Sequence, residues 1–307
     1  MSNKVSSPLR YPGGKSKLTK YVEHILDINS IKGTYIEPFA GGAGIATNLL
    51  LKDQVDKIVI NDLDPSVFSF WYFIKNNANQ LIKQIEEVPF TSKECNLTPE
   101  ELIIYWDSIK RKYNDNRGKK NLEEAFSFFM LNRMNRSGII SGGPIGGRSQ
   151  DGKYNITVRF NKADLINRIE KISEKSDRII VQNLDAVSLI QNVVNSSVDL
   201  TNSLLFVDPP YFYQGKNLYP SYIKENGHSL IAEALMSYKD LRWIETYDVS
   251  KQISDYYNAK EINKYLYYLR YSASTKRISA EMIFSSQNII IDSYEKVLLQ
   301  KLAFENN

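Results

Sequence analysis

The stretch best suited to chemistry is an acid and two prolines at the end of an apolar run. Residues 204–207 are four apolar residues in a row, a pattern typical of a short strand buried on both faces. Pro209 and Pro210 have no N–H to donate, so the strand should end there. Asp208 is then left at the carboxyl end of a strand, where open α/β sheets bind ligands. Tyr211 follows on a stiff turn, where its ring could cover a flat ligand.

Such a site could activate an aromatic amine. The exocyclic N6 of adenine is a poor nucleophile because its lone pair is delocalised into the ring. If Asp208 and the carbonyl of Pro209 hold the two N6 hydrogens, the nitrogen becomes tetrahedral and its lone pair can attack in line. Tyr211 could stack on a base that has been flipped out of a helix. A strand that simply ends at an Asp-Pro turn is the alternative, and this tetrapeptide alone leaves the two interpretations level.

Composition limits the classes of protein. The chain has 307 residues, of which 42% are hydrophobic, enough for a sizeable core and two domains. It shows no long apolar run and no N-terminal signal pattern, so we expect a cytoplasmic protein without membrane contact. The single cysteine, Cys95, excludes an internal disulfide framework or a cysteine zinc cluster. With only two histidines as well, no metal site is expected.

Charge is distributed unevenly along the chain. The net charge is +4, but residues 110–178 contain sixteen Lys and Arg against eight Asp and Glu, a balance of +8, which leaves −4 for the rest. A basic middle within a mildly acidic chain predicts a polyanionic partner for that middle.

Two glycine-containing turns precede predicted helices near the N-terminus. Residues 8–15 (PLRYPGGK) lead into a helix with one apolar face, and Lys15 could reach a ligand lying on the glycine pair. Residues 34–39 form a predicted strand, and the glycine-rich residues 40–44 open the next helix, as at the start of a Rossmann-like half. The spacing is neither the dinucleotide fingerprint nor a phosphate-binding loop, so a pyrophosphate ligand is not the first expectation. Each turn alone is a weak signal.

Acids follow two further predicted strands. Asp62 lies about 20 residues beyond the glycine turn, where Rossmann folds bind ribose hydroxyls. Asp64 precedes Pro65 and is typical of a helix cap. Asp185 follows a predicted strand at 178–183 and could accept a hydrogen bond from a purine amino group. Helix capping is an equally good interpretation of Asp62 and Asp185.

The middle of the chain is predicted to be an insertion. From residue 65 to about 133 the pattern is helical, with a capping box at Thr98 and Glu101, and no strand of a parallel sheet fits. Residues 133–148 contain five glycines and three arginines, a composition suited to a loop that follows a phosphate backbone or enters a groove. Residues 156–160 are predicted to form part of a hairpin with this loop. A solvated loop with ordinary surface charge is the less favoured alternative.

After residue 161 the α/β rhythm returns and closes with a predicted antiparallel pair. The predicted fold is therefore α/β: a Rossmann-like sheet, mostly parallel with an antiparallel end, plus an inserted, mainly helical domain with a hairpin. We expect residues 1–75 and 162–307 to form one domain and residues 76–161 the other. The polar, aromatic loop at 212–223, which includes Lys216, could hold a base or shield the reaction from water.

Taken in order, these motifs resemble those of the Dam-like DNA adenine-N6 methyltransferases. The four matching segments are residues 10–15 (RYPGGK), 37–42 (EPFAGG), 61–62 (ND) and 208–211 (DPPY). Weaker likenesses are Asp185, residues 246–248 and Glu281. The resemblance covers residue 8 to about residue 292 and is loose in the insertion. The order of N-terminal motif, glycine motif, insertion and catalytic motif is itself characteristic of this family.

The resemblance implies S-adenosylmethionine as cofactor, without a metal, on a Rossmann-like methyltransferase sheet. It implies catalytic roles for Asp208, Pro209, Pro210 and Tyr211. The implied cofactor-binding residues are Tyr11, Lys15, Glu37, Phe39, Gly41, Asp62, Asp185 and Asp208, with Asp62 on the ribose and Asp185 on the adenine. The predicted DNA contacts are Arg133, Arg136, Arg148, Lys153, Arg159 and Lys216.

The resemblance thus predicts site-specific methylation of adenine N6 in double-stranded DNA by direct in-line transfer to a flipped base. It also suggests a cognate restriction nuclease as partner and a monomer or weak dimer. Two departures are visible: the glycine pattern has Ala43 where a glycine is expected, and the recognition loop differs from that of Dam, which leaves the target sequence open. Alternatives are an RNA adenine methyltransferase and an inactive DNA-binding relative. A nicotinamide dehydrogenase fits least, because the dinucleotide glycine spacing and a proton-relay histidine are missing.

Overall fold

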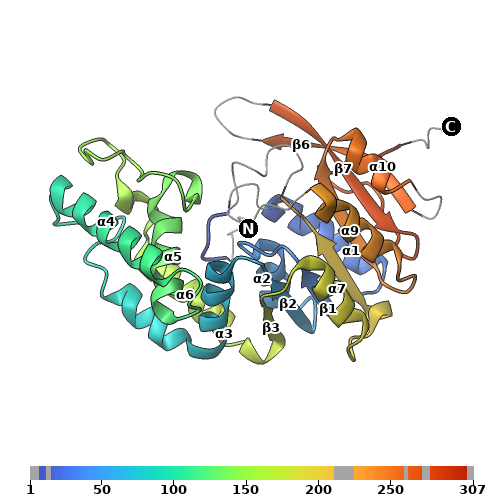
Figure 1. Cartoon of the computed structure of the whole chain (residues 1–307), viewed down its shortest axis with the longest axis horizontal. Coiled ribbons are helices and arrows are strands. Elements are labelled where there is room, and N and C mark those ends of the chain that lie inside the picture. Colours follow the sequence, from blue (N-terminus) through green and yellow to red (C-terminus); the bar gives the residue numbers. More distant parts are fainter. Residues whose placement is uncertain (1–6, 12–14, 211–224, 259–261, 272–276, 303–307) are drawn as a thin grey trace.

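A computed structural model describes residues 7–11, 15–210, 225–258, 262–271 and 277–302 (Figure 1). Its centre is an eight-stranded sheet in the order β3-β2-β1-β4-β5-β7-β6-β8. The strands are β1 (Thr34–Glu37), β2 (Lys57–Asn61), β3 (Ile179–Gln182), β4 (Ser203–Val207), β5 (Trp243–Asp248), β6 (Ile262–Tyr271), β7 (Arg277–Ser286) and β8 (Gln300–Lys301). The first five in this order are parallel, and β7, β6 and β8 pair antiparallel. The predicted α/β fold, with a mostly parallel sheet and an antiparallel end, is confirmed.

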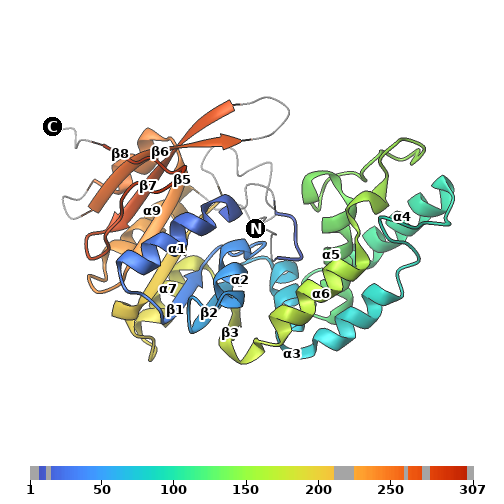
Figure 2. The same ribbon diagram turned by 180° about the vertical axis from the view of Figure 1, so that it is seen from behind.

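Helices cover both faces of the sheet because its central strands are apolar on both sides. One face packs against α1 (Thr19–Ile28) and α2 (Gly44–Leu51), as Figure 2 shows. The other face packs against α7 (Ala186–Val194), α9 (Glu225–Met236) and α10 (Lys251–Tyr256). All five residues of β4 are buried, in agreement with the apolar run in the sequence. No helix within the described ranges combines the length and apolar character needed to cross a bilayer.

The order in which the strands are added to the sheet reverses between β1 and β4, which are parallel. From β1 the chain continues to β2 and β3 on one side, whereas β4 and β5 lie on the other. The register pairs Tyr35 with Leu204 and Ile36 with Leu205. The carboxyl ends of β1 and β4, and with them Glu37 and Asp208, therefore meet at a topological switch point, where such sheets bind ligands.

Four helices form the body beside the sheet: α3 (Pro65–Glu86), α4 (Pro99–Asn116), α5 (Leu122–Met134) and α6 (Lys162–Ser173) (Figure 1). The side chain of Asp64 caps α3, and the predicted capping box of Thr98 and Glu101 is present on α4. An aromatic core joins α3 to α5, where the rings of Phe70 and Phe129 stack at 5.4 Å. Helix α3 is kinked at Asn77, next to the predicted domain boundary, which itself stays a prediction.

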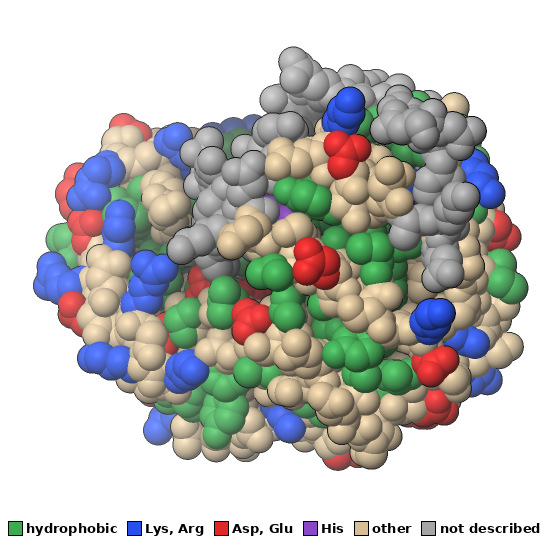
Figure 3. All heavy atoms as spheres, turned by 45° about the vertical axis from the view of Figure 1, so that its right-hand side comes forward, with side chains coloured by type: hydrophobic (Ala, Val, Ile, Leu, Met, Phe, Trp, Pro, Cys, Tyr) green, Lys and Arg blue, Asp and Glu red, His purple; other side chains and the backbone are tan. Residues whose placement is uncertain are grey.

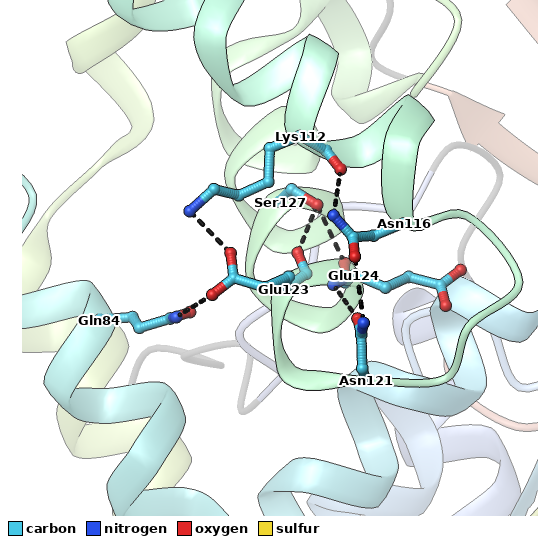
Figure 4. Close-up of polar contacts among 7 residues, drawn as sticks. All are labelled: Gln84, Lys112, Asn116, Asn121, Glu123, Glu124 and Ser127. Atoms are coloured by element: carbon cyan, nitrogen blue, oxygen red, sulfur yellow. Dashed lines mark hydrogen bonds and ion pairs between the residues drawn. The ribbon is translucent and has the colours of Figure 1, made fainter.

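Buried polar contacts fix the turn between α4 and α5. Glu124 is fully buried, and its carboxylate accepts hydrogen bonds from the N–H groups of Gly118 (2.8 Å) and Lys120 (2.7 Å) and from the Ser66 hydroxyl (2.7 Å). Asn121 caps α5 by accepting a hydrogen bond from the N–H of Glu124 (Figure 4). These bonds connect α3 to the α4–α5 turn.

The predicted hairpin strand at 156–160 is wrong. Ile156–Arg159 forms a 3-10 helix, because Asn155 accepts hydrogen bonds from both the N–H (3.0 Å) and the hydroxyl (2.8 Å) of Thr157. Within residues 135–160 the only strand-like pairing is an isolated bridge between Asn135 and Pro144. The β-branched residues suggested a strand, but the local cap determines the conformation.

Candidate active site

Asp208 is held at the end of β4 by groups from two other elements. Its Oδ1 accepts a hydrogen bond from the Thr246 hydroxyl on β5 (2.8 Å) and lies 3.6 Å from the Lys15 ammonium. The Asp208 side chain is 23% exposed, while Pro209 beside it is buried. Among the described residues, the hydrogen bond from Thr246 and the ion pair with Lys15 are both made to Oδ1. Tyr211 and Lys216 lie outside the described residues.

Burial and neighbouring groups shift the pKa of Asp208 in both directions. Burial raises the pKa of Asp208 to about 6, while Lys15 and the Thr246 hydrogen bond act in the opposite direction. The nearby charge of Glu281 adds to the increase. Near neutral pH the carboxylate is therefore mainly ionised and can accept a hydrogen bond from an amine.

Lys15 connects the N-terminal motif to the antiparallel end of the sheet. It opens a 3-10 turn, Lys15–Leu18, and its ammonium lies 2.5 Å from Glu281 Oε2 on β7. The Tyr267 hydroxyl on β6 donates to the same oxygen. Both partners of this ion pair are shielded from solvent, with 3% of the Lys15 side chain and 2% of the Glu281 side chain exposed. The predicted site residue Lys15 is thus brought to the predicted site residue Asp208.

The glycine turn is fitted closely around an aromatic ring. Gly41 has a φ of +45°, and a Cβ at this position would lie 2.7 Å from the Tyr11 ring. The Trp71 indole donates to the carbonyl of Gly41 (2.9 Å). Only glycine combines this backbone conformation with so near a neighbour. The structure therefore places Tyr11 against the turn that the sequence predicted for the cofactor.

Asp62 supports the same turn from β2. Its Oδ2 accepts from the N–H of Gly41 and its Oδ1 from the N–H of Asp64, both at 2.9 Å. Burial raises the pKa of Asp62 to about 7, although these two hydrogen bonds lower it. Each oxygen keeps a further lone pair, so the carboxylate can also accept from a ligand hydroxyl.

Glu37 ends β1 beside Asp208. It is buried and accepts from the Tyr35 hydroxyl (3.1 Å) and the N–H of Ala46 (3.2 Å). Burial raises the pKa of Glu37 to about 8, and the charge of Asp208 contributes to the increase. Phe39, two residues further on, is half-buried and packs on the core that contains α7 and α9.

Asp185 lies at the same end of the sheet, after β3. Its carboxylate caps α7 by accepting from the N–H (2.9 Å) and hydroxyl (2.6 Å) of Ser188. The capping interpretation is confirmed, and the cofactor role stays a prediction. Two asparagines for which the sequence predicted no role of their own connect these strand ends: Asn61, noted only as part of a motif, and Asn183. Asn61 bonds to the carbonyls of Pro38 and Leu184, and Asn183 bonds to that of Asp62.

The predicted DNA contacts differ in their surroundings. Arg133 is largely buried and donates to the carbonyls of Arg159 and Pro8. Burial lowers the pKa of Arg133 to about 9, with Arg10 and Arg168 adding repulsion. Arg148 makes a two-point ion pair with Asp107.

The other predicted contacts described here are exposed: Arg136, Lys153 and Arg159. Figure 3 shows Lys and Arg side chains gathered on the side where the helical body lies. In the described part of the chain, no group of three or more His, Cys, Asp or Glu residues is arranged to hold a metal ion.

Residues 11–284 match the D12 class N6 adenine-specific DNA methyltransferase family, and the chain belongs to this family. A curated relative is a Type II methyltransferase, M.MjaIII, from Methanocaldococcus jannaschii. The two are 24% identical over 207 residues, which is 66% of this chain and 68% of the relative. Among solved structures, the rRNA methyltransferase aviRa from Streptomyces viridochromogenes aligns with 89% of this chain and 85% of its own, at 12% identity and a TM-score of 0.37. So low a TM-score adds nothing to the assignment, which rests on the family match.

Proposed function

We propose that this protein transfers a methyl group from S-adenosylmethionine to the N6 of an adenine flipped out of double-stranded DNA. The observation that carries the proposal is the placement of Asp208 in a chain of this family. Its carboxylate ends a central strand and is held through Oδ1 by Thr246 and Lys15. Oδ2 would then face the substrate.

The residues around the switch point suit this cofactor. Asp62 retains acceptor capacity for ribose hydroxyls, and the Tyr11 ring, which packs on the Gly41 turn, would line the cofactor site. Asp185 would face the adenine, and Glu37 and Phe39 would shape the methionine end. Tyr11 and Lys15 would line the rest of the cofactor site. The bound cofactor supplies an already activated methyl group on a sulfonium.

The protein's own contribution is alignment. Asp208 Oδ2 and the Pro209 carbonyl would hold the two hydrogens of N6, so that the lone pair points at the methyl group. Orientation of this kind is worth roughly 7–11 kcal/mol of a barrier. Extruding the base costs a few kcal/mol, which phosphate contacts can offset. Tyr211 and Pro210 would flank the flipped base.

The helical insertion would read the DNA. Residues 76–161 would form the recognition domain, and residues 1–75 with 162–307 the catalytic domain. Exposed Arg136, Lys153 and Arg159 would contact phosphates or bases, as would Lys216. Arg133 and Arg148 would also contact the DNA. Arg133 would do so while bonded to the carbonyls of Arg159 and Pro8, and Arg148 while paired with Asp107. We further propose a cytoplasmic monomer or weak dimer, with a restriction nuclease as its cognate partner.

The test is to incubate the protein with labelled S-adenosylmethionine and a mixed-sequence pool of duplex DNA, then map the modified bases. The expected result is N6-methyladenine confined to one short sequence context. Label that enters structured RNA but not duplex DNA would refute the proposed substrate, and the absence of transfer to either would refute the proposed activity.

A further inference from the structure

A continuous set of contacts extends from Asp208 to the antiparallel end of the sheet. The Lys15 ammonium is 3.6 Å from Asp208 Oδ1 and 2.5 Å from Glu281 Oε2. The Tyr267 hydroxyl donates to that same Glu281 oxygen. The proposed reaction assigns no role to Glu281 or Tyr267, yet both are buried beside the catalytic acid.

Burial makes this ion pair sensitive to the loss of either partner. The side chains of Lys15 and Glu281 are 3% and 2% exposed. A charge in such a place is stable only while its partner is present, because water cannot replace the partner. Glu281 therefore determines where the Lys15 ammonium lies, and Tyr267 restricts the orientation of the Glu281 carboxylate.

The strand register ties the same elements to Asp208. Tyr267 on β6 lies opposite Glu281 on β7, and Glu281 lies opposite Asp248 on β5. Thr246, two residues earlier on β5, donates to Asp208 Oδ1. Side chains two residues apart on a strand share one face of the sheet. Strands β5, β7 and β6 together thus position both Lys15 and Thr246, the two residues that contact Asp208.

We propose that Glu281 is a positioning residue of this active site, an inference that rests on the proposed function. It holds the Lys15 ammonium beside Asp208 Oδ1, with its own carboxylate fixed by Tyr267. Lys15 and Thr246 then both occupy the Oδ1 side, and Oδ2 stays directed at the target amine. At pH 8, where Asp208 is ionised with or without the charge of Glu281, Glu281 acts on the reaction through Lys15.

The first arm of the test is kinetic and, like the second, is run at pH 8. Glu281→Gln keeps the side-chain shape but loses the charge, so kcat is expected to fall roughly 10- to 100-fold, with KM for DNA and for S-adenosylmethionine changed by less than about threefold. Tyr267→Phe should lower kcat by a smaller factor. The matched control is Glu23→Gln, which removes the charge of another ion-paired glutamate, 2.5 Å from Lys52 and on α1. It should leave kcat within about twofold.

The second arm is a double-mutant cycle. In a Lys15→Met background, adding Glu281→Gln should change kcat by less than about twofold, because the group through which Glu281 acts is gone. A purely structural role for Glu281 would lower kcat by the same factor in both backgrounds. That result would overturn the proposal.

The third arm does not depend on activity. An amine-acetylating reagent followed by peptide mass spectrometry measures the reactivity of Lys15, with exposed Lys20 as internal reference. Glu281→Gln should raise Lys15 labelling at least threefold over wild type, and Tyr267→Phe should raise it less. If wild type methylates no DNA, the proposed function fails while the labelling still decides whether Glu281 holds Lys15. If Glu281→Gln does not fold, Tyr267→Phe carries the same comparison. Unchanged Lys15 labelling in a folded variant would contradict the proposal.

Discussion

Glu245 offers a prediction about stability that can be worked out from its surroundings. It lies on β5, its side chain is fully buried, and neither carboxylate oxygen has a hydrogen-bond partner among the residues that the structure describes. The Tyr257 hydroxyl faces it without hydrogen-bond geometry and only partly offsets the cost of burial. Burial raises the pKa of Glu245 to about 8 from its ordinary value of 4.5.

The sign and size of the effect follow from linkage. The folded protein binds this proton more tightly than the unfolded chain does, so the free energy of unfolding is highest when the group is protonated. It falls as the pH rises from about 4.5 to 8. A difference of about 3.5 pKa units corresponds to about 5 kcal/mol, as an upper limit that ignores relaxation.

Glu245→Gln removes this proton equilibrium. Urea unfolding of wild type and variant between pH 5 and pH 9 should show similar stability at pH 5, and a variant more stable by several kcal/mol at pH 9. Replacing Glu295, an exposed glutamate, with Gln is the matched control and should give no such divergence. A constant difference between wild type and Glu245→Gln across this range would refute the reasoning.

Three further predictions concern the site and the helical body. Asp208 must be ionised to accept a hydrogen bond from the amine, and its pKa is about 6. The single-turnover rate of methyl transfer should therefore fall about tenfold per pH unit below pH 6 and level off above pH 7. A flat profile down to pH 5 would contradict this role. Gly41→Ala places a Cβ on a left-handed backbone and against the Tyr11 ring. Calorimetry should therefore show the affinity for S-adenosylmethionine reduced at least about tenfold. An unchanged affinity would contradict the proposal that this turn binds the cofactor. Thr98→Ala removes one half of a capping box and should lower the free energy of unfolding by about 1 kcal/mol in urea titrations, without changing methyl transfer; a loss below about 0.3 kcal/mol would show that the cap contributes little.

The sheet could be predicted because its strands carry a strong local signal. The apolar run before Asp208 and the strand, glycine turn and helix after residue 34 each identify an element without tertiary information. The capping residues Asp64 and Thr98 were likewise identified from spacing alone, and the structure confirms both. The resemblance to a family then supplied the order in which these elements assemble.

The polar contacts around Asp208 could not be predicted, because they join residues that are distant in sequence. Lys15 and Glu281 are 266 positions apart, and Thr246 reaches Asp208 from a neighbouring strand. In the sequence, Glu281 is only a weak likeness to the family, and no neighbouring residue indicates its partner. The error at residues 156–160 has the opposite origin, since the β-branched pattern is real but the Asn155 cap turns the backbone into a 3-10 helix.

The most direct test of the central claim compares wild type with Asp208→Asn in single-turnover transfer of labelled methyl from S-adenosylmethionine to adenine N6 in duplex DNA, with cofactor binding measured in parallel. The amide keeps the size of the side chain but cannot present two acceptor oxygens. The predicted result is a rate at least about 100-fold lower at saturating S-adenosylmethionine, with an unchanged fold. A variant that transfers methyl at the wild-type rate would contradict the account.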